Sequence, residues 1–396
     1  MANRILLAAT VGWPSAARYA AGFAAAGCTV DALSPADAIV RKSRYVCGHH
    51  TYNPLFPGRS LRAAIAKSDP DLIVPCDDRA VSHLLALQED ASSALIERSL
   101  GAPANYPLLL SRHGSLAALR AEGVRVPDSF AIDSAAALDA ALDQTGFPAV
   151  LKSDGSWGGD GVVIVRTREE AHAARRKLAD APPRWRSLAR ALRRRDGHFL
   201  HDALKPPRRA VSLQKFIAGR PAAAAFAARD GAVVGAIAYD VLSAEGDIGP
   251  PNVIRRVDCA EIHAAARTVA RRFGLSGLHG LDFIRDASGA VHLIEINPRA
   301  TQGGTLAFGP GCDLPAALAV AFSLGHRGIR SAIAGDLVAF FPRAWQRGSQ
   351  SYLPAAHHDI PWDDPAVLAA IAGLPAVQTS DAALRTAVRA RFGVAA

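Results

Sequence analysis

The chain has 396 residues, of which half are apolar and 20% are charged, a composition typical of globular proteins with two or three domains. No apolar run is long enough for a transmembrane helix, and the apolar start of the chain predicts a β-strand rather than a signal peptide. The five cysteines lack the spacing of metal sites or disulfides, so we expect reduced thiols and a cytoplasmic protein.

The first part of the chain, residues 1–105, alternates strand and helix signals. Apolar runs at Arg4–Ala9, Cys28–Leu33 and Asp71–Pro75 predict strands, and the helical segments between them indicate a parallel sheet. The stretch Val40–Pro57 contains two histidines, two tyrosines and two prolines. It predicts a long loop that lines a site.

Two acidic residues, Asp77 and Asp78, follow the third of these strands. Ligands of open parallel sheets bind beyond the carboxyl ends of the strands, which makes both residues weak candidates for substrate contacts. Either carboxylate can instead cap the helix predicted at Ala80–Leu87, and the sequence leaves both readings open.

A glycine-rich flap lies between two predicted strands, Phe147–Lys152 and Val162–Val165. The flap, Ser153–Gly161, contains four glycines, which let backbone N–H groups approach phosphate oxygens closely. Lys152 adds a positive charge at the base of the flap for the same phosphates. The segment is not a Walker loop, and the alternative is a turn that is only flexible.

A basic segment follows the flap. Residues 166–210 hold 14 Lys and Arg against 5 Asp and Glu, which accounts for the whole net charge of +9. Within them, residues 184–195 place Trp185, Leu188 and Leu192 at helical intervals and predict a short amphipathic helix with a cationic face. Such a face can bind nucleic acid, an anionic membrane or an acidic partner, but we favour an ordinary solvated surface.

The segments that follow predict a second β-rich region. Residues 222–238 predict a hairpin around Asp230-Gly231, and Glu261–Phe273 predicts a helix that ends at Gly274. The tail after residue 330 predicts helices bounded by prolines.

The most informative segment is Leu278–Thr301, which predicts a β-hairpin around a two-residue turn at Ser288-Gly289. Counting outward from that turn places Asp282 opposite Glu295. The alternation of strand side chains puts Asn297 on the same face as Glu295. Two carboxylates and an amide oxygen form a hard-oxygen set suited to Mg²⁺.

A basic residue, Arg299, follows this set two positions later, where it can meet a phosphate that shares the metal. The alternative is a solvated hairpin with ordinary surface charges. We favour the metal site because Glu295 and Asn297 interrupt an apolar run that predicts burial, and a buried carboxylate without a partner is costly.

Taken together, the order of these segments resembles the ATP-grasp superfamily over about residues 1–325. The resemblance rests on Ser111-Arg-His-Gly-Ser-Leu116, Pro148–Gly161, Gln214-Lys-Phe-Ile-Ala-Gly219, Leu281-Asp-Phe283 and Glu295-Ile-Asn-Pro-Arg299. It implies an α/β fold (α+β in the ATP-grasp part), with a parallel α/β domain at 1–105, a two-lobed ATP-grasp domain with antiparallel sheets at 106–330, and a helical C-terminal tail at 331–396. The lid lobe would cover about 130–212 and the C-terminal lobe about 213–330.

The resemblance also implies roles for the matching residues. The implied ATP-binding residues are Arg112, Lys152, Ser153, Gly155, Ser156, Gly158, Gly159, Gly161, Gln214, Lys215, Phe216 and Ile217. The implied ligands of Mg²⁺ or Mn²⁺ are Asp282, Glu295 and Asn297. The implied catalytic residues are Lys152, Arg299, Arg255 and Arg256, of which only one of the last two faces the site because strand neighbours alternate. Substrate contacts would come from Thr301, Gln302, Gly303 and Gly304, with Asp77 and Asp78 as weaker candidates.

Similar enzymes activate a carboxylate as an acyl-phosphate and couple it to an amine. The resemblance therefore implies a ligase that uses ATP and Mg²⁺, takes a small-molecule acid and an amine, and forms a homodimer. Gln214 departs from the Glu that many relatives carry at the start of the hinge strand. Two alternatives stay open: a non-catalytic ATP-binding sensor or scaffold that docks a polyanion or membrane through residues 184–195, and an ATP-grasp enzyme that forms a thioester or an ester.

Overall fold

The computed structural model describes residues 3–87, 91–155, 161–179, 189, 209–246, 249–325, 330–346, 348–374 and 381–394. Two predictions lie outside these residues: the cationic helix at 184–195, apart from Ala189, and the centre of the flap with Ser156, Gly158 and Gly159. Among the helices that the structure describes, none combines the length and the apolar character needed to cross a membrane. All five cysteines are free thiols.

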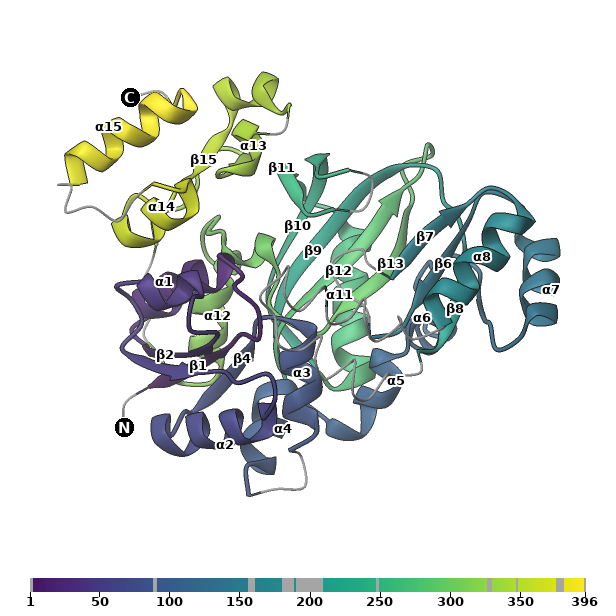
Figure 1. The fold of residues 1–396 in the computed structure, drawn as a ribbon, viewed down its shortest axis with the longest axis horizontal. Coiled ribbons are helices and arrows are strands. Elements are labelled where there is room, and N and C mark those ends of the chain that lie inside the picture. Colours follow the sequence, from purple (N-terminus) through teal and green to yellow (C-terminus); the bar gives the residue numbers. More distant parts are fainter. Residues whose placement is uncertain are drawn as a thin grey trace.

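The N-terminal sheet has four parallel strands in the order β3-β2-β1-β4 (Figure 1). Its strands are β1 (Arg4–Ala8), β2 (Thr29–Ser34), β3 (Gly48–Thr51) and β4 (Leu72–Pro75). The helices around it are α1 (Ser15–Ala25), α2 (Pro57–Ser68), α3 (Asp78–Leu85) and α4 (Ser93–Leu100). The parallel sheet is confirmed, and its inner strands are buried because helices cover both faces.

The loop predicted at Val40–Pro57 is wrong in part, because it contains a 3₁₀ helix (Ile39–Lys42) and the edge strand β3. The sequence of β3, Gly-His-His-Thr, has no apolar alternation, so periodicity could not reveal it. Tertiary contacts hold it in the sheet: His50 Nε2 lies 3.4 Å from the buried carboxylate of Asp31, which also accepts a hydrogen bond from Arg4.

The central sheet has seven strands in the order β13-β12-β9-β10-β11-β14-β15, antiparallel except for the last pair. Its first five strands along the chain are β9 (Arg220–Arg229), β10 (Ala232–Ala244), β11 (Pro251–Arg256), β12 (Gly277–Arg285) and β13 (Val291–Asn297). The predicted hairpin between β9 and β10 is confirmed, and Asp230 and Gly231 in its turn have φ of 50° and 80°. These positive angles match the right-handed twist of the two strands.

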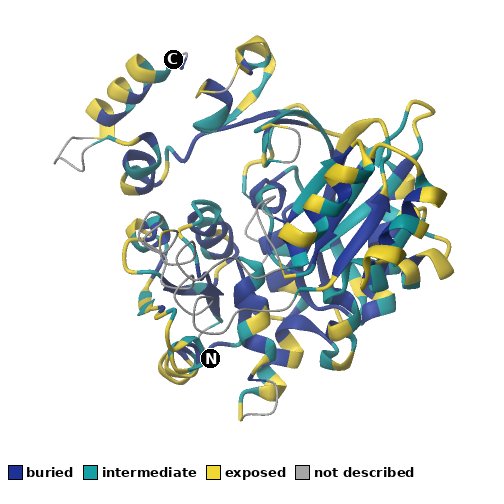
Figure 2. Cartoon of the chain, turned by 45° about the vertical axis from the view of Figure 1, so that its right-hand side comes forward, coloured by how far each residue is buried: buried dark blue, intermediate teal, exposed yellow. Residues whose placement is uncertain are grey.

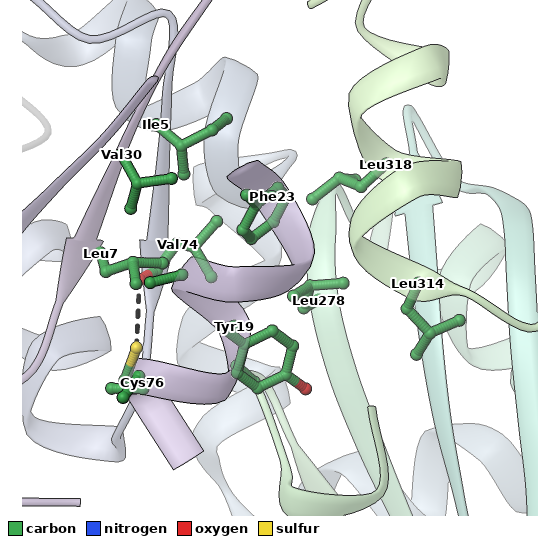
Figure 3. Packing of buried hydrophobic residues seen from close by; sticks show 14 of the residues in the cluster. Ile5, Leu7, Tyr19, Phe23, Val30, Val74, Cys76, Leu278, Leu314 and Leu318 are labelled. Atoms are coloured by element: carbon green, nitrogen blue, oxygen red, sulfur yellow. Dashed lines mark hydrogen bonds between the residues drawn. The ribbon is translucent and has the colours of Figure 1, made fainter. Parts of the chain in front are cut away.

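The two faces of the central sheet pack against different helices. One face, with Leu278 and Ile237, joins a core with α1 and α12 (Leu314–Ala321), in which Tyr19 and Phe23 lie between the two sheets (Figure 3). The other face packs on α11 (Ala260–Phe273), which ends at Gly274 as predicted. The N-terminal sheet and its helices therefore cover the face that carries Leu278.

A smaller sheet forms the lid of the molecule, with the antiparallel order β5-β8-β6-β7. Its elements are β5 (Ser129–Ala131), α7 (Ala135–Thr145), β6 (Ala149–Ser153), β7 (Val162–Val165), α8 (Arg168–Ala179) and β8 (Val211–Lys215). Two short helices lead into it, α5 (Tyr106–Leu110) and α6 (Arg112–Ala121). The predicted strands on either side of the flap are confirmed as the pair β6 and β7. Figure 2 shows the exposed sides of the helices turned away from the buried strands.

The tail is helical as expected, and it also adds two strands to the central sheet. Its elements are β14 (Leu337–Phe340), α13 (Arg343–Gln346), a 3₁₀ helix (Gln350–Ala355), β15 (His357–Asp359), α14 (Pro365–Ala372) and α15 (Asp381–Phe392). The strands have four and three residues, too short for a periodic signal, and pairing with β11 is what forms them. Asp364 then accepts a hydrogen bond from Ser43, which ties the tail to the N-terminal part.

Candidate functional site

The predicted pairing of Asp282 with Glu295 is confirmed, but the hairpin reaches it by a different route. The predicted two-residue turn is wrong: the loop runs from Asp286 to Ala290, and the Asp286 carboxylate accepts hydrogen bonds from the backbone N–H groups of Ser288 and Ala290. This loop offsets the register by one residue. A β-bulge between the pairs Phe283–Leu293 and Asp282–Glu295 then restores it.

The bulge gives the backbone carbonyl of Ile294 two side-chain donors from the lid sheet. Lys152 Nζ donates to it at 2.9 Å and Gln214 Nε2 at 3.5 Å. Lys152, on β6, is buried, and this burial lowers the pKa of its ammonium to about 8 while the Glu295 carboxylate opposes the shift. The bulge thus joins the two sheets at the predicted site.

The three predicted metal ligands converge. Asn297 Nδ2 donates to Asp282 Oδ2 at 2.8 Å, and Glu295 lies on the neighbouring strand opposite Asp282. Enclosure by neighbouring atoms raises the pKa of Asp282 to about 6, and the charge of Glu295 adds to the rise. Two carboxylates that repel each other beside an amide oxygen fit a divalent cation, which would relieve that repulsion.

Arg112, at the start of α6, reaches the same set. Its Nη2 lies 2.9 Å from Glu295 Oε1, and its backbone N–H donates to the carboxylate of Asp154 at the base of the flap. Ser153 N–H donates to the carbonyl of Gly161, which closes the flap at its base. The start of α6 therefore contacts both the hairpin, at Glu295, and the base of the flap, at Asp154.

Arg299 connects this site to the N-terminal part. Its Nε donates to Asp78 Oδ2 at 2.9 Å, and its Nη2 donates to Asn297 Oδ1 at 3.0 Å. The neighbouring Asp77 accepts hydrogen bonds from Thr10 and from the N–H of Ala80 instead, so it caps α3. Of the two acidic candidates, the site therefore includes Asp78.

The register of the central sheet decides between Arg255 and Arg256. Arg256 pairs with Tyr239, Tyr239 pairs with Ala223, and Ala223 pairs with Asp282. Side chains directly opposite one another lie on the same face of a sheet, so Arg256 shares the face of Asp282 and Arg255 lies on the other. Arg256 is exposed, and its guanidinium lies 5.1 Å from the centre of the Phe308 ring.

The predicted substrate loop, Thr301–Gly304, forms a 3₁₀ turn against α1 and β10. Tyr19 donates to the carbonyl of Thr301 at 2.6 Å. A Cβ added at Gly303 would lie 2.5 Å from the ring of Tyr239, so this close approach requires glycine. Gln302 accepts a hydrogen bond from Arg343 of the tail at 3.3 Å.

The remaining predicted nucleotide contacts follow β8. Gln214 is buried next to the hairpin, Lys215 is exposed, and Phe216 and Ile217 are half-buried in the segment that leads to β9. Gly155 has a φ of 65°, and an added Cβ would meet no atom within 4 Å. Of these positions, Gln214 contacts the hairpin directly, through the carbonyl of Ile294.

The sequence did not reveal two residues of the site, Tyr239 and Arg343. Counting from the Asp230-Gly231 turn would have placed Tyr239 opposite Ala222, because the sequence gives no sign of the register shift between Val233 and Gly235 that pairs it with Ala223. No sequence signal could have indicated Arg343, because it reaches Gln302 only through the packing of the tail.

Comparisons with known proteins identify the domain and the fold. The model of the ATP-grasp domain matches residues 197–303. The chain contains an ATP-grasp domain. Among curated proteins, none matches the sequence.

Solved structures share this ATP-grasp fold at low sequence identity. N5-carboxyaminoimidazole synthase from Aspergillus clavatus is 14% identical, with a TM-score of 0.58 over 82% of this chain and 78% of that one. Biotin carboxylase from Campylobacter jejuni is 16% identical, with a TM-score of 0.57 over 80% of this chain and 70% of that one. N5-carboxyaminoimidazole ribonucleotide synthetase from Thermus thermophilus is 16% identical, with a TM-score of 0.57 over 84% and 80%.

Proposed function

We propose that the protein is a ligase that uses ATP to activate a small-molecule carboxylate and couples it to an amine. A carboxylate oxygen attacks the γ-phosphorus of ATP, and the bond to the β,γ-bridging oxygen breaks to release ADP. The amine nitrogen then attacks the acyl carbon, expels phosphate and loses a proton.

One observation carries the proposal: cationic and oxygen ligands converge from three separate parts of the fold. Lys152 comes from the lid sheet, Arg112 from α6, and Asp282, Glu295 and Arg299 from the hairpin. Phosphoryl transfer requires mainly positioning and neutralisation of charge, which this set supplies. The fold is shared with structures that hold ADP with 5-aminoimidazole ribonucleotide, ATP, or MgADP with bicarbonate.

The nucleotide would lie between the lid sheet and the hairpin. Arg112 and Lys152 are placed to bind its phosphates, and the backbone of Ser153–Gly161 would close over them. The segment from Gln214 to Ile217 would present backbone groups to the adenine. A closed flap excludes water, which an acyl-phosphate needs because it hydrolyses easily.

A divalent cation fits the hairpin. Asp282, Glu295 and Asn297 would hold Mg²⁺ or Mn²⁺, and the cation would neutralise charge on the phosphate oxygens. Arg299, which Asp78 orients, would bind the moving phosphoryl group from the opposite side.

The acid and the amine would enter between the hairpin and the N-terminal part. Thr301–Gly304 and Arg256 lie on this side, on the face of the central sheet that the N-terminal helices cover. The proposed division into residues 1–105, 106–330 and 331–396 would then place the site where the first two parts meet.

The proposal is tested by measuring ADP release from ATP and Mg²⁺ with pools of acids and amines. The acids are bicarbonate, the twenty amino acids and linear dicarboxylates, and each active combination is followed by mass spectrometry of the product. We expect release that requires both an acid and an amine, and an amide as product. A thioester or ester would support the alternative ligase, and no acid-dependent release would contradict the proposal.

A matched pair of variants identifies the site. Glu295→Ala should abolish turnover while the circular dichroism spectrum stays unchanged, because it removes the central carboxylate. Glu122→Ala removes a carboxylate that pairs with Arg271 and Arg272 on the surface, so it should keep full activity. Full activity in Glu295→Ala would contradict the assignment.

A further inference from the structure

Tyr239 occupies a central position on the site face of the central sheet. It lies in one cross-strand row with Arg256 on one side and with Ala223 and Asp282 on the other. Two strand spacings separate its Cα from that of Asp282, roughly 10 Å. The residue between them in the row is Ala223, which carries only a methyl group.

The hydroxyl of Tyr239 makes no hydrogen bond to any residue that the structure describes, although the side chain is 4% exposed. Tyrosine hydroxyls at such buried positions usually have a partner. The ring edge packs on Gly303, and the hydroxyl oxygen lies 2.7 Å from the position of a Cβ added there. The hydroxyl is therefore held beside the substrate loop, with no hydrogen-bond partner among the described residues.

Other groups already hold this loop in place. Tyr19 donates to the carbonyl of Thr301, and Arg343 donates to Gln302. Tyr239 adds no hydrogen bond to the loop. Its polar end is therefore not required for the fold, which leaves it available to a ligand.

Burial and the negative charge of Asp282 both raise the pKa of Tyr239 above its ordinary value. The phenol is therefore protonated at neutral pH. A protonated hydroxyl is uncharged. It can donate a hydrogen bond to an anionic oxygen without adding a second positive charge near Arg299.

On the basis of the proposed function, we propose that Tyr239 is a substrate-binding residue, whose hydroxyl donates a hydrogen bond to the carboxylate of the acid. Its place between Asp282 and the substrate loop orients that carboxylate toward the γ-phosphate. Tyr239 thereby favours an acid over an analogue without an acceptor oxygen, because only the acid gains this hydrogen bond.

The first test observes Tyr239 directly. The full chain is labelled with 3-fluorotyrosine, and the ¹⁹F resonance of Tyr239 among six tyrosines is assigned by its absence from Tyr239→Phe. Sodium acetate, the probe, is titrated in the presence of Mg²⁺ and β,γ-methylene-ATP. We expect a saturable shift of the Tyr239 resonance and none at Tyr106, whose hydroxyl donates to Leu100 in another part of the core. A stationary Tyr239 resonance would overturn the proposal.

The second test is kinetic and uses the acid that drives ADP release. Tyr239→Phe should raise KM for that acid about tenfold, because one hydrogen bond to a charged group is lost, and should leave KM for ATP unchanged. Tyr106→Phe removes a buried hydroxyl elsewhere and should change neither KM. Equal KM values for the acid in wild type and Tyr239→Phe would refute the role.

The two failures are distinguishable. A Tyr239 shift with acetate but no acid-dependent ADP release would support the binding role and contradict the ligase. Acid-dependent ADP release with a stationary Tyr239 resonance would support the ligase and contradict the binding role.

Discussion

His279 should make the fold sensitive to mild acid. It lies on β12 with 2% of its surface exposed, its Nε2 is 2.8 Å from the carbonyl of Ser276, and its ring packs on Phe226. Its buried Nδ1 has no hydrogen-bond partner among the described residues. Protonation would place an unpaired charge there, which is why burial lowers the pKa of His279 to about 4 from an ordinary 6.5.

The sign and size of the effect follow from these two pKa values. The folded pKa is below the unfolded one, so the unfolded chain binds more protons between pH 6.5 and pH 4. Stability from this group is fully present above the unfolded pKa and falls as the pH drops toward the folded one. At pH 5 the loss relative to pH 8 is about 2 kcal/mol in the free energy of unfolding.

The perturbation is His279→Gln, which keeps a donor for Ser276 but cannot titrate. The assay is urea unfolding at pH 8 and pH 5, and the quantity compared is the loss of unfolding free energy between the two pH values. Wild type should lose about 2 kcal/mol more than His279→Gln. The control His263→Gln, at a half-buried histidine beside exposed Asp258, should lose as much as wild type. Equal losses in wild type and His279→Gln would refute the reasoning.

Two further predictions concern a backbone contact and the ion pair between Arg112 and Glu295. Gly101→Ala should lower the free energy of unfolding by more than about 3 kcal/mol, because φ is +92° and the new Cβ would lie 2.0 Å from the carbonyl oxygen of Gly274. The control Gly123→Ala, with φ of +83° and no atom within 4 Å, should lower it by only about 1 kcal/mol. Thermal unfolding measures both, and equal melting temperatures for the two variants would contradict this prediction. Arg112→Gln should tighten binding of Mn²⁺ alone about tenfold, since the guanidinium of Arg112 pairs with the Glu295 carboxylate and would compete with the cation for it. Electron paramagnetic resonance of free Mn²⁺ measures this, and weaker binding in the variant would argue against a shared carboxylate.

Patterns among residues close together in the sequence were enough to predict the hairpin and the flap. The Asp230-Gly231 turn, the glycine after α11 and the apolar runs of β1, β2 and β4 each depend on neighbours in sequence, so pattern alone predicted them. The same is true of Asp282, Glu295, Asn297 and Arg299, whose spacing on two strands indicated one face. The predicted turn of the hairpin was wrong, but the predicted pairing of Asp282 with Glu295 was still correct because a β-bulge restored the register.

The remaining parts of the site depend on contacts between distant residues. Register across four strands decided that Arg256 rather than Arg255 shares the face of Asp282. Packing against the N-terminal helices placed Asp78 beside Arg299 and Tyr239 beside Gly303. The tail brought Arg343 to Gln302 and added β14 and β15.

The sequence by itself therefore determined the chemistry of the site: which oxygen ligands and which cations the chain offers, and on which strands they lie. Only the tertiary structure decided which of these groups meet and which tyrosine lies beside them. The physical reason is range. Turns, caps and strand alternation follow from backbone sterics over a few residues, whereas sheet register and the packing of separate parts are set by burial of surfaces that lie far apart in the chain.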